Sequence, residues 1–289
     1  MARVTASAER YAAVPSLSFH PPTILVFDSG LGGLSVFREI TRLRPDAHYV
    51  YAADDAGFPY GALSDSALSG RVCDVMDTLL PAVRPDIVVV ACNTASTLAL
   101  PVLRARYGVP FVGTVPAIKP ACAASVSRRV SVLATPGTVR RDYTSALIRE
   151  FASSCQVALV PSERLAGIAE SLIQGVPVDD ADIRAEIAPC FVRDAGGRTD
   201  TVVLACTHYP LILDQLRRLA PWPVAWVDPA EAIARRVVSL LGPTAFASSP
   251  GPVRLISTGR ALDAALVGAL VQRRVEMPEI LPTRLAVAS

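Results

Sequence analysis

The chain has little lysine: Lys119 is its only one, and every other residue among its 28 basic side chains is an arginine. A Schiff base with pyridoxal phosphate requires a lysine, and Lys119 lies between Pro116 and Pro120 without a cofactor-binding signature. The sequence also has no GK[ST] triplet, so it lacks a phosphate-binding P-loop. We therefore expect a reaction that uses no cofactor.

Cysteine and histidine occur in patterns that exclude several kinds of site. The six cysteines form no CxxC pair and no compact framework, which predicts free thiols rather than disulfides. Three dispersed histidines and unpaired cysteines do not supply a zinc site, so no metal is expected. A cysteine phosphatase needs an arginine six residues after its cysteine, and those positions hold Leu98 and Ile212.

Long apolar runs and strong net charge are also missing. No run reaches the length of a membrane span, and residues 1–22 lack the apolar core of a secretory signal, so we expect a cytoplasmic protein without a membrane partner. The formal net charge is only +2 and the arginines are scattered, which argues against nucleic acid as a partner. With 289 residues, 51% of them hydrophobic, the chain is long enough for two modest domains that act on a small molecule.

Two segments of the sequence are nearly alike. Residues 86–94 read DIVVVACNT, and residues 200–208 read DTVVLACTH. Each is an apolar, β-branched run that ends in a cysteine, Cys92 or Cys206, which is typical of a buried parallel strand with a thiol at its carboxyl end. Each is followed by a helical segment and a second strand, so the unit is duplicated. Two such units facing each other would place one thiol on either side of a cleft, as a two-base reaction requires.

Strands and helices are predicted to alternate along the whole chain. Strands are expected at 23–27, 48–52, 86–91, 129–134, 156–160, 200–205 and 253–258, and helices at 34–43, 65–80, 141–152, 165–174, 179–192, 229–241 and 261–272. This order predicts an α/β protein with two similar doubly wound parallel-sheet lobes and the active site in the cleft between them. We expect a flexible N-terminal extension at 1–22, a first lobe at 23–115 completed by 227–275, and a second lobe at 116–226.

A glycine-rich turn follows the first predicted strand. Asp28 and Ser29 lie where this strand meets the turn and a helix, so Ser29 and nearby amides could bind an anion while Asp28 binds a cation or moves a proton. The spacing of Gly30, Gly32 and Gly33 does not match the dinucleotide fingerprint GxGxxG. A turn whose glycines serve backbone geometry alone is the alternative.

The two strand-end thiols are the strongest catalytic candidates. Cys92 and Cys206 each precede a predicted helix start, where the helix dipole and free N–H groups lower the pKa of a thiol. His208 lies two residues after Cys206 and could orient that thiol or buffer its proton. The other four cysteines lie on or beside predicted helices and are expected to be structural: Cys73, Cys122, Cys155 and Cys190.

Four motifs in order carry a resemblance to a known family: FDSGLGGLSV at 27–36, PYG at 59–61, ACNTAS at 91–96 and ACTHYP at 205–210. With them the chain closely resembles the glutamate racemases, cofactor-independent members of the aspartate/glutamate racemase family, over about 23–241. The resemblance implies glutamate as the substrate and D-glutamate supply for peptidoglycan synthesis. It implies Cys92 and Cys206 as catalytic acid and base, with Asp28 and His208 assisting.

The resemblance also implies which residues line the substrate site: Asp28, Ser29, Tyr60, Gly61, Asn93, Thr94, Thr207 and His208, with Thr135 and Thr138 in a turn that touches the substrate carboxylate less consistently. Many family members place an acidic residue after a Val-Pro pair in the second lobe. Here that stretch reads Val160-Pro161-Ser162-Glu163-Arg164, its register is not fixed, and no role is assigned to Glu163.

Two alternatives remain open at this point. One is an aspartate or hydantoin racemase of the same superfamily, against which the Asp28-Ser29 turn and the Cys206-Thr-His208 segment argue. The other is a two-lobed amino-acid binding protein or sensor, which would not require both thiols. The sequence does not fix the oligomeric state, and a homodimer is one arrangement that it allows.

Overall fold

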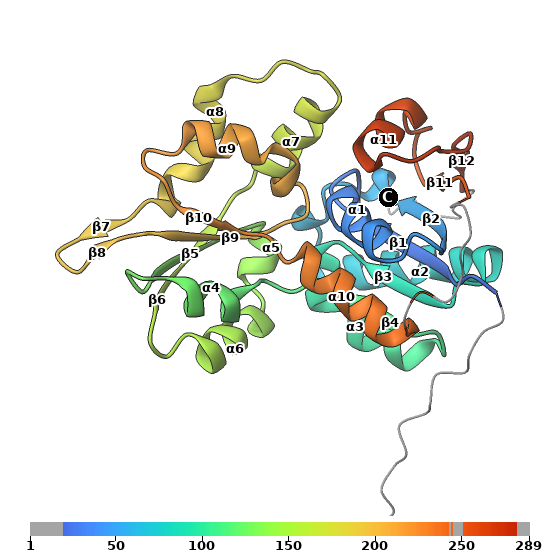
Figure 1. Ribbon diagram of the computed structural model, residues 1–289, viewed down its shortest axis with the longest axis horizontal. Helices are drawn as coiled ribbons and strands as arrows, with labels where there is room; N and C mark the ends of the chain where they lie inside the picture. The colour runs from blue at the N-terminus through green and yellow to red at the C-terminus, as the bar shows by residue number, and fades with distance from the viewer. Residues whose placement is uncertain (1–19, 243, 245–250, 282–289) are drawn as a thin grey trace, which may run out of the picture.

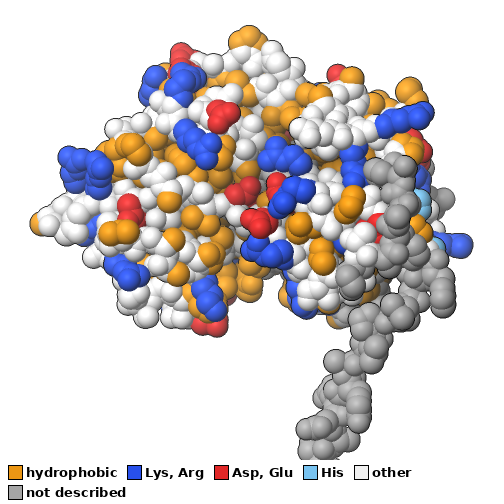
Figure 2. All heavy atoms as spheres, in the orientation of Figure 1, with side chains coloured by type: hydrophobic (Ala, Val, Ile, Leu, Met, Phe, Trp, Pro, Cys, Tyr) orange, Lys and Arg blue, Asp and Glu red, His pale blue; other side chains and the backbone are white. Residues whose placement is uncertain are grey.

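The structure, a computed structural model, describes residues 20–242, 244 and 251–281 and has two lobes, each built around a parallel sheet (Figure 1). Most of the predicted N-terminal extension, residues 1–19, lies outside the described part. Arginine and acidic side chains are interspersed with hydrophobic and neutral atoms on the face shown in Figure 2. No helix in the described ranges is long and apolar enough to cross a membrane.

The first lobe contains a six-stranded sheet in the order β12-β11-β2-β1-β3-β4. Its strands are β1 (Thr23–Asp28), β2 (His48–Ala53), β3 (Ile87–Val90), β4 (Phe111–Gly113), β11 (Arg254–Ser257) and β12 (Glu279–Ile280). Its helical elements are α1 (Leu34–Leu43), η1 (Asp55–Gly57), η2 (Tyr60–Ala62), α2 (Asp65–Val83), α3 (Asn93–Arg106), α10 (Ala230–Leu241) and α11 (Ala264–Val271).

The second lobe contains a four-stranded sheet in the order β10-β9-β5-β6. Its strands are β5 (Arg129–Ala134), β6 (Gln156–Pro161), β9 (Thr201–Ala205) and β10 (Ala225–Val227), beside a small hairpin of β7 (Arg193–Asp194) and β8 (Gly197–Arg198). Its helical elements are α4 (Ile118–Ala124), α5 (Pro136–Val139), α6 (Asp142–Phe151), α7 (Leu165–Ile173), α8 (Asp180–Ile187), η3 (Ala188–Cys190), η4 (Tyr209–Ile212) and α9 (Leu213–Leu219).

Each sheet is buried on both faces, which explains why its central strands are apolar without alternation. In β1, Ile24 and Val26 join the core under α1, α10 and α11, whereas Leu25 and Phe27 join the core under α2 and α3. In the second lobe, α7 to α9 cover one face of the sheet, and α4 and α6 cover the other.

The strand order places a topological switch point in each sheet. The chain leaves β1 for β2 on one side and returns to β3 on the other, and it leaves β5 for β6 and returns to β9 in the same manner. Ligands of open α/β sheets bind at the carboxyl ends of strands at such points. Asp28 and Cys92 lie at the first switch point, and Thr135 and Cys206 lie at the second.

The structure corrects two details of the sequence prediction. The helix expected at 179–192 ends at Ile187, because Pro189 lacks the N–H that would continue it. The β7-β8 hairpin is antiparallel, although only parallel pairing was expected, and strands of two residues are too short to show a period. In addition, Val227 still belongs to β10 of the second sheet, so the chain returns to the first lobe after this residue.

Candidate active site

The carboxyl ends of the two sheets enclose one small cavity. Its volume is about 20 Å³, which is room for one or two water molecules. Cys92 and Cys206 both line it and are each 6% exposed, so two thiols from opposite lobes reach one desolvated space. The lining residues are Ser29, Phe58, Pro59, Tyr60, Gly61, Cys92, Asn93, Thr94, Thr135, Ala166, Cys206, Thr207 and His208.

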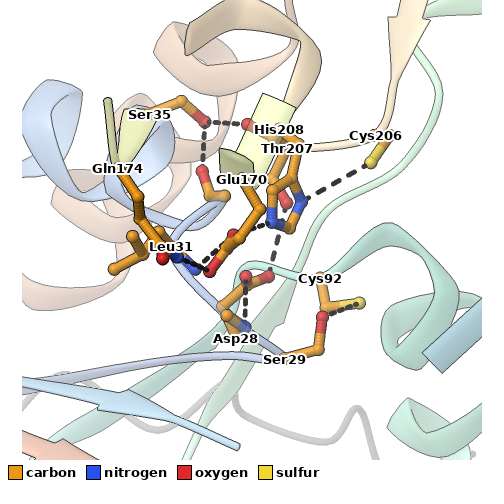
Figure 3. Close-up of polar contacts among 12 residues, drawn as sticks. Asp28, Ser29, Leu31, Ser35, Cys92, Glu170, Gln174, Cys206, Thr207 and His208 are labelled. Carbon is orange, nitrogen blue, oxygen red and sulfur yellow. Dashed lines mark hydrogen bonds and ion pairs between the residues drawn. The ribbon is translucent and has the colours of Figure 1, made fainter. Parts of the chain in front are cut away.

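Cys92 follows β3 and immediately precedes α3. The Ser29 hydroxyl donates a hydrogen bond to its Sγ over 3.8 Å (Figure 3). The expectation that the helix start lowers the pKa of this thiol is wrong. Burial is the largest influence and raises the pKa of Cys92 to about 12, with the charges of Asp28 and Cys206 acting in the same direction. The Ala95 N–H and the Ser29 hydroxyl oppose this increase without outweighing it. The Cys92 thiol therefore keeps its proton at neutral pH in this form of the protein.

Cys206 has a different environment, because an imidazole lies beside it. His208 Nδ1 is 3.8 Å from Cys206 Sγ, and His208 Nε2 is 2.7 Å from Glu170 Oε2 (Figure 3). Burial alone would lower the pKa of His208, but its hydrogen bonds to Cys206 and Glu170 and the charges of Cys206 and Asp28 raise this pKa well above its ordinary value. The second thiol thus has an ionisable imidazole beside it, which a carboxylate holds in place.

Sequence reasoning missed Glu170. It lies on α7, and although burial would raise the pKa of this carboxyl group, His208, the Leu31 N–H and Arg260 lower it overall. The Leu31 N–H, from the first lobe, donates to Glu170 Oε2 over 3.3 Å. Two signals in the sequence could have indicated Glu170. It lies in the predicted helix 165–174, and the family pattern places an acidic residue after Val160-Pro161 in the second lobe. Glu163 is exposed and does not line the cavity that contains the two thiols.

Asp28 is buried at the end of β1 and connects the two lobes. Its Oδ2 accepts a hydrogen bond from the Gly30 N–H over 3.0 Å, and its Oδ1 accepts one from the Thr207 hydroxyl over 3.3 Å. Burial raises the pKa of Asp28, whereas His208 and the backbone N–H groups of Gly30 and Gly33 act against this increase. Asp28 lies behind the residues that line the cavity. It therefore holds the Thr207 hydroxyl in place and influences the electrostatic potential of the site.

Two glycines of the 30–33 turn, Gly32 and Gly33, are required for close approach. None of them has a positive φ, so the alternative of backbone geometry alone does not explain them. A Cβ at Gly32 would lie 2.3 Å from His208 Nδ1, and a Cβ at Gly33 would lie 2.6 Å from the Cβ of Asp28. Any side chain at Gly32 would therefore displace the imidazole.

The remaining site residues form the polar wall of the cavity. Asn93 is buried, and within the described part of the chain neither polar atom of its side chain has a hydrogen-bond partner, which leaves both available to a ligand. The Thr94 hydroxyl is 2.9 Å from that of Thr135 and 3.5 Å from that of Thr138, although Thr138 itself does not line the cavity. This pair of hydroxyl contacts joins the start of α3 to the α5 turn of the other lobe.

Two aromatic residues flank Pro59 at the start of η2, and one of them, Phe58, reaches across the cleft. The Phe58 ring is 5.3 Å from the His208 ring and packs on the core of the second lobe, a role that sequence reasoning did not assign. The Tyr60 hydroxyl donates to Asp54 over 2.5 Å, and Arg71 binds both oxygens of the same carboxylate. Tyr60 therefore contributes its ring to the cavity wall, while its hydroxyl anchors the loop.

The four cysteines expected to be structural lie outside the cavity. Cys73, Cys122 and Cys190 are buried within lobe cores, and Cys155 is half-buried beside Cys122. Burial raises the pKa of Cys190 to about 12.

The chain is similar over most of its length to known racemases. The profile of the Asp/Glu/Hydantoin racemase family matches residues 24–237. A protein named glutamate racemase from Brucella anthropi is 58% identical over 239 residues, which cover 82% of this chain and 86% of that protein. The crystal structure of Escherichia coli glutamate racemase, in complex with L-glutamate and the activator UDP-MurNAc-ala, is 40% identical with a TM-score of 0.81 and covers 90% of this chain and 98% of its own. Glutamate racemase from Aquifex pyrophilus is 26% identical with a TM-score of 0.70, covering 91% of this chain and 100% of its own.

Proposed function

The chain belongs to the Asp/Glu/Hydantoin racemase family, and from this premise we propose that it interconverts L-glutamate and D-glutamate without a cofactor, with Cys92 and Cys206 as acid and base. The observation that carries the proposal is the presence of both thiols, from opposite lobes, in one buried cavity. The glutamate racemases named above, which match most of the chain, support glutamate as the substrate.

The chemical difficulty is the α-proton of an amino acid, whose carbanion is poorly stabilised without a cofactor. One thiolate removes the proton from one face while the opposite thiol donates a proton to the other face. Cys92, which retains its proton, is suited to donation, and Cys206, beside the His208–Glu170 pair, is suited to proton removal. The reverse direction exchanges these roles, because each enantiomer presents its proton to the other sulfur.

Polar groups of the cavity wall hold the charged ends of the substrate. We assign carboxylate binding to the hydroxyls of Thr94 and Thr135 and to the unpartnered amide of Asn93. Asp28 and Glu170 lie behind this wall and act on the substrate ammonium group only through Thr207 and His208, the lining residues that they contact. The small, buried cavity strengthens each of these interactions during proton transfer, because little water fits into it.

Substrate entry requires movement, since glutamate needs several times the volume of the cavity. A neighbouring cavity of about 380 Å³ shares Pro59, Gly61, Thr135 and Ala166 with it. We propose that this larger cavity is the entrance, and that substrate reaches the thiols when the lobes separate. The product D-glutamate supplies peptidoglycan synthesis in the cytoplasm.

Incubation with L-glutamate in deuterated water tests the proposal. We expect the circular dichroism signal to decay to zero, the α-proton to be replaced by deuterium, and D-glutamate to give the same end point. Cys92→Ala and Cys206→Ala should each retain less than about 1% of the activity in both directions, because each direction needs an acid and a base. Cys73→Ala is the control, since Cys73 is buried outside the cavity. Substantial activity in either catalytic-site variant would contradict the two-thiol mechanism.

Reaction rates with aspartate and hydantoins, measured in parallel with glutamate, distinguish a glutamate racemase from other members of the superfamily. We expect glutamate to react at least about a hundredfold faster than aspartate, because a misplaced carboxylate leaves buried polar groups unpaired. Equal rates would assign the chain to a broader amino-acid racemase.

A further inference from the structure

The loop that follows β11 is held rigidly against the first lobe. Asp55 accepts hydrogen bonds from three consecutive N–H groups of this loop: Thr258 over 3.1 Å, Gly259 over 2.8 Å and Arg260 over 3.0 Å. The Thr258 hydroxyl donates in addition to Asp54, the residue that anchors Tyr60. The position of Arg260 is therefore fixed relative to the carboxyl end of β2.

From this loop, the Arg260 side chain reaches the second lobe. Its Nη2 donates to Gln174 Oε1 over 3.1 Å. Gln174 Nε2 in turn lies 3.5 Å from Glu170 Oε1, and the two side chains are neighbours because they are four residues apart at the end of α7. Figure 3 shows Gln174 and Leu31 on one side of the Glu170 carboxylate and His208 on the other.

The two oxygens of Glu170 thus have separate partners. Oε2 binds His208 and the Leu31 N–H, and Oε1 binds Gln174. A carboxylate held at one oxygen still rotates, whereas contacts at both oxygens define its plane. The contact at Oε1 depends on Gln174, whose amide is itself oriented by a cation of the opposite lobe.

We propose that Arg260 is a positioning residue for the reaction: through Gln174 it orients the Glu170 carboxylate on His208, and it does so only when the two lobes are closed. The inference rests on the proposed function, because the effect is measured as racemisation. Arg260 touches neither the cavity nor either thiol. Its positive charge also helps to lower the pKa of Glu170, which keeps the carboxylate ionised.

Steady-state kinetics of Arg260→Ala and Gln174→Leu test the proposal. Both residues are exposed, so their contact is screened by solvent, and we expect a loss of about three- to tenfold in kcat with KM changed by less than about twofold. Arg260→Lys should recover most of the activity, since lysine also donates to the Gln174 oxygen. Arg254→Ala is the matched control, because Arg254 lies on β11 and pairs with Glu279 away from the cleft.

A double-mutant cycle separates positioning from a purely structural role. If Arg260 acts through Glu170, adding Arg260→Ala to Glu170→Gln should cause little further loss, whereas independent effects would multiply. Gln174→Leu leaves the Asp55 contacts of the loop in place, so it tests the connection even if Arg260→Ala fails to fold. Unchanged kcat in Gln174→Leu and Arg260→Ala, or independent effects in the cycle, would overturn the inference while wild-type racemisation remained. Failure of the wild type to racemise glutamate would instead refute the proposed function.

Discussion

His208 Nε2 lies 2.7 Å from Glu170 Oε2, although the two residues belong to different segments of the second lobe, the end of β9 and the middle of α7. The contact fixes the orientation of the imidazole that lies beside one of the two thiols, Cys206. Cys92 has a hydroxyl group, that of Ser29, in place of an imidazole. The duplicated strand ends are therefore chemically unequal in the folded protein.

Glu170→Gln should change the pH dependence of racemisation. The hydrogen bond to the Glu170 carboxylate helps to raise the pKa of His208, so its replacement by a neutral amide lowers this pKa and the imidazolium is lost at a lower pH. We expect the alkaline limb of the kcat/KM profile to move to lower pH and kcat/KM to fall by about ten- to hundredfold. Because the equilibrium constant between enantiomers is one, this fall must be the same in both directions.

Two further variants are compared with Glu170→Gln in the same pH profile. His208→Asn should reproduce the loss, with unequal effects on kcat in the two directions. Glu186→Gln serves as the control, since Glu186 binds Ser162 and Arg164 outside the cavity. An unchanged profile in Glu170→Gln would reduce the carboxylate to a cleft-lining role.

The Cys92 thiol should react slowly with alkylating reagents at neutral pH. Burial raises its pKa to about 12, so the thiolate that reacts is scarce at pH 7 and its fraction grows about tenfold for each pH unit up to that pKa. Peptide mass spectrometry after short exposure to iodoacetamide gives the rate at this cysteine, and glutamate should protect it. A rate that levels off near neutral pH would show that the helix start outweighs burial.

Gly32→Ala should impair turnover more than folding. The added Cβ would lie 2.3 Å from His208 Nδ1, so the imidazole must move away from Cys206. We expect kcat to fall by at least about tenfold while the melting temperature changes by only a few degrees. Gly70→Ala is the matched control: nothing lies within 4 Å of its Cβ on α2, and alanine in a helix interior should stabilise the protein by up to about 1 kcal/mol. Equal activity of the two variants would show that the turn tolerates a side chain.

The single lysine allows one substitution to test independence from pyridoxal phosphate. Lys119 lies on α4 with its Nζ 5.1 Å from the centre of the Phe151 ring, outside the catalytic cavity. Lys119→Arg should keep activity within about twofold, because arginine preserves this cation–π contact and forms no Schiff base. Exhaustive dialysis and chelators should also leave the activity intact. Inactivation of Lys119→Arg, or loss of wild-type activity on dialysis or chelation that added pyridoxal phosphate or a metal reverses, would contradict a cofactor-free reaction.

The structural features that depend on short stretches of sequence, such as buried strands and their order with helices, could be predicted. The β-branched runs before Cys92 and Cys206 indicated buried parallel strands, and their place before helices indicated thiols at the carboxyl ends of sheets. The alternation of strands and helices predicted two doubly wound lobes, because local periodicity reports which face of each element is buried. The ends of elements were predicted less well. The helix expected at 179–192 stops before Pro189, and the two-residue strands of the hairpin were not predicted.

Tertiary structure decided what depends on distance between separate segments. Glu170 became a partner of His208 only because α7 packs beside the end of β9, and no spacing in the sequence records that approach. Likewise, the raised pKa of Cys92 follows from burial by both lobes, which outweighs the local helix start that the sequence shows. The sequence by itself determined which chemical groups this protein can use, since residue types and local periods are written in it. Only the closed fold decided which of those groups share a proton, because pKa values and hydrogen bonds depend on burial and on contacts made across the cleft.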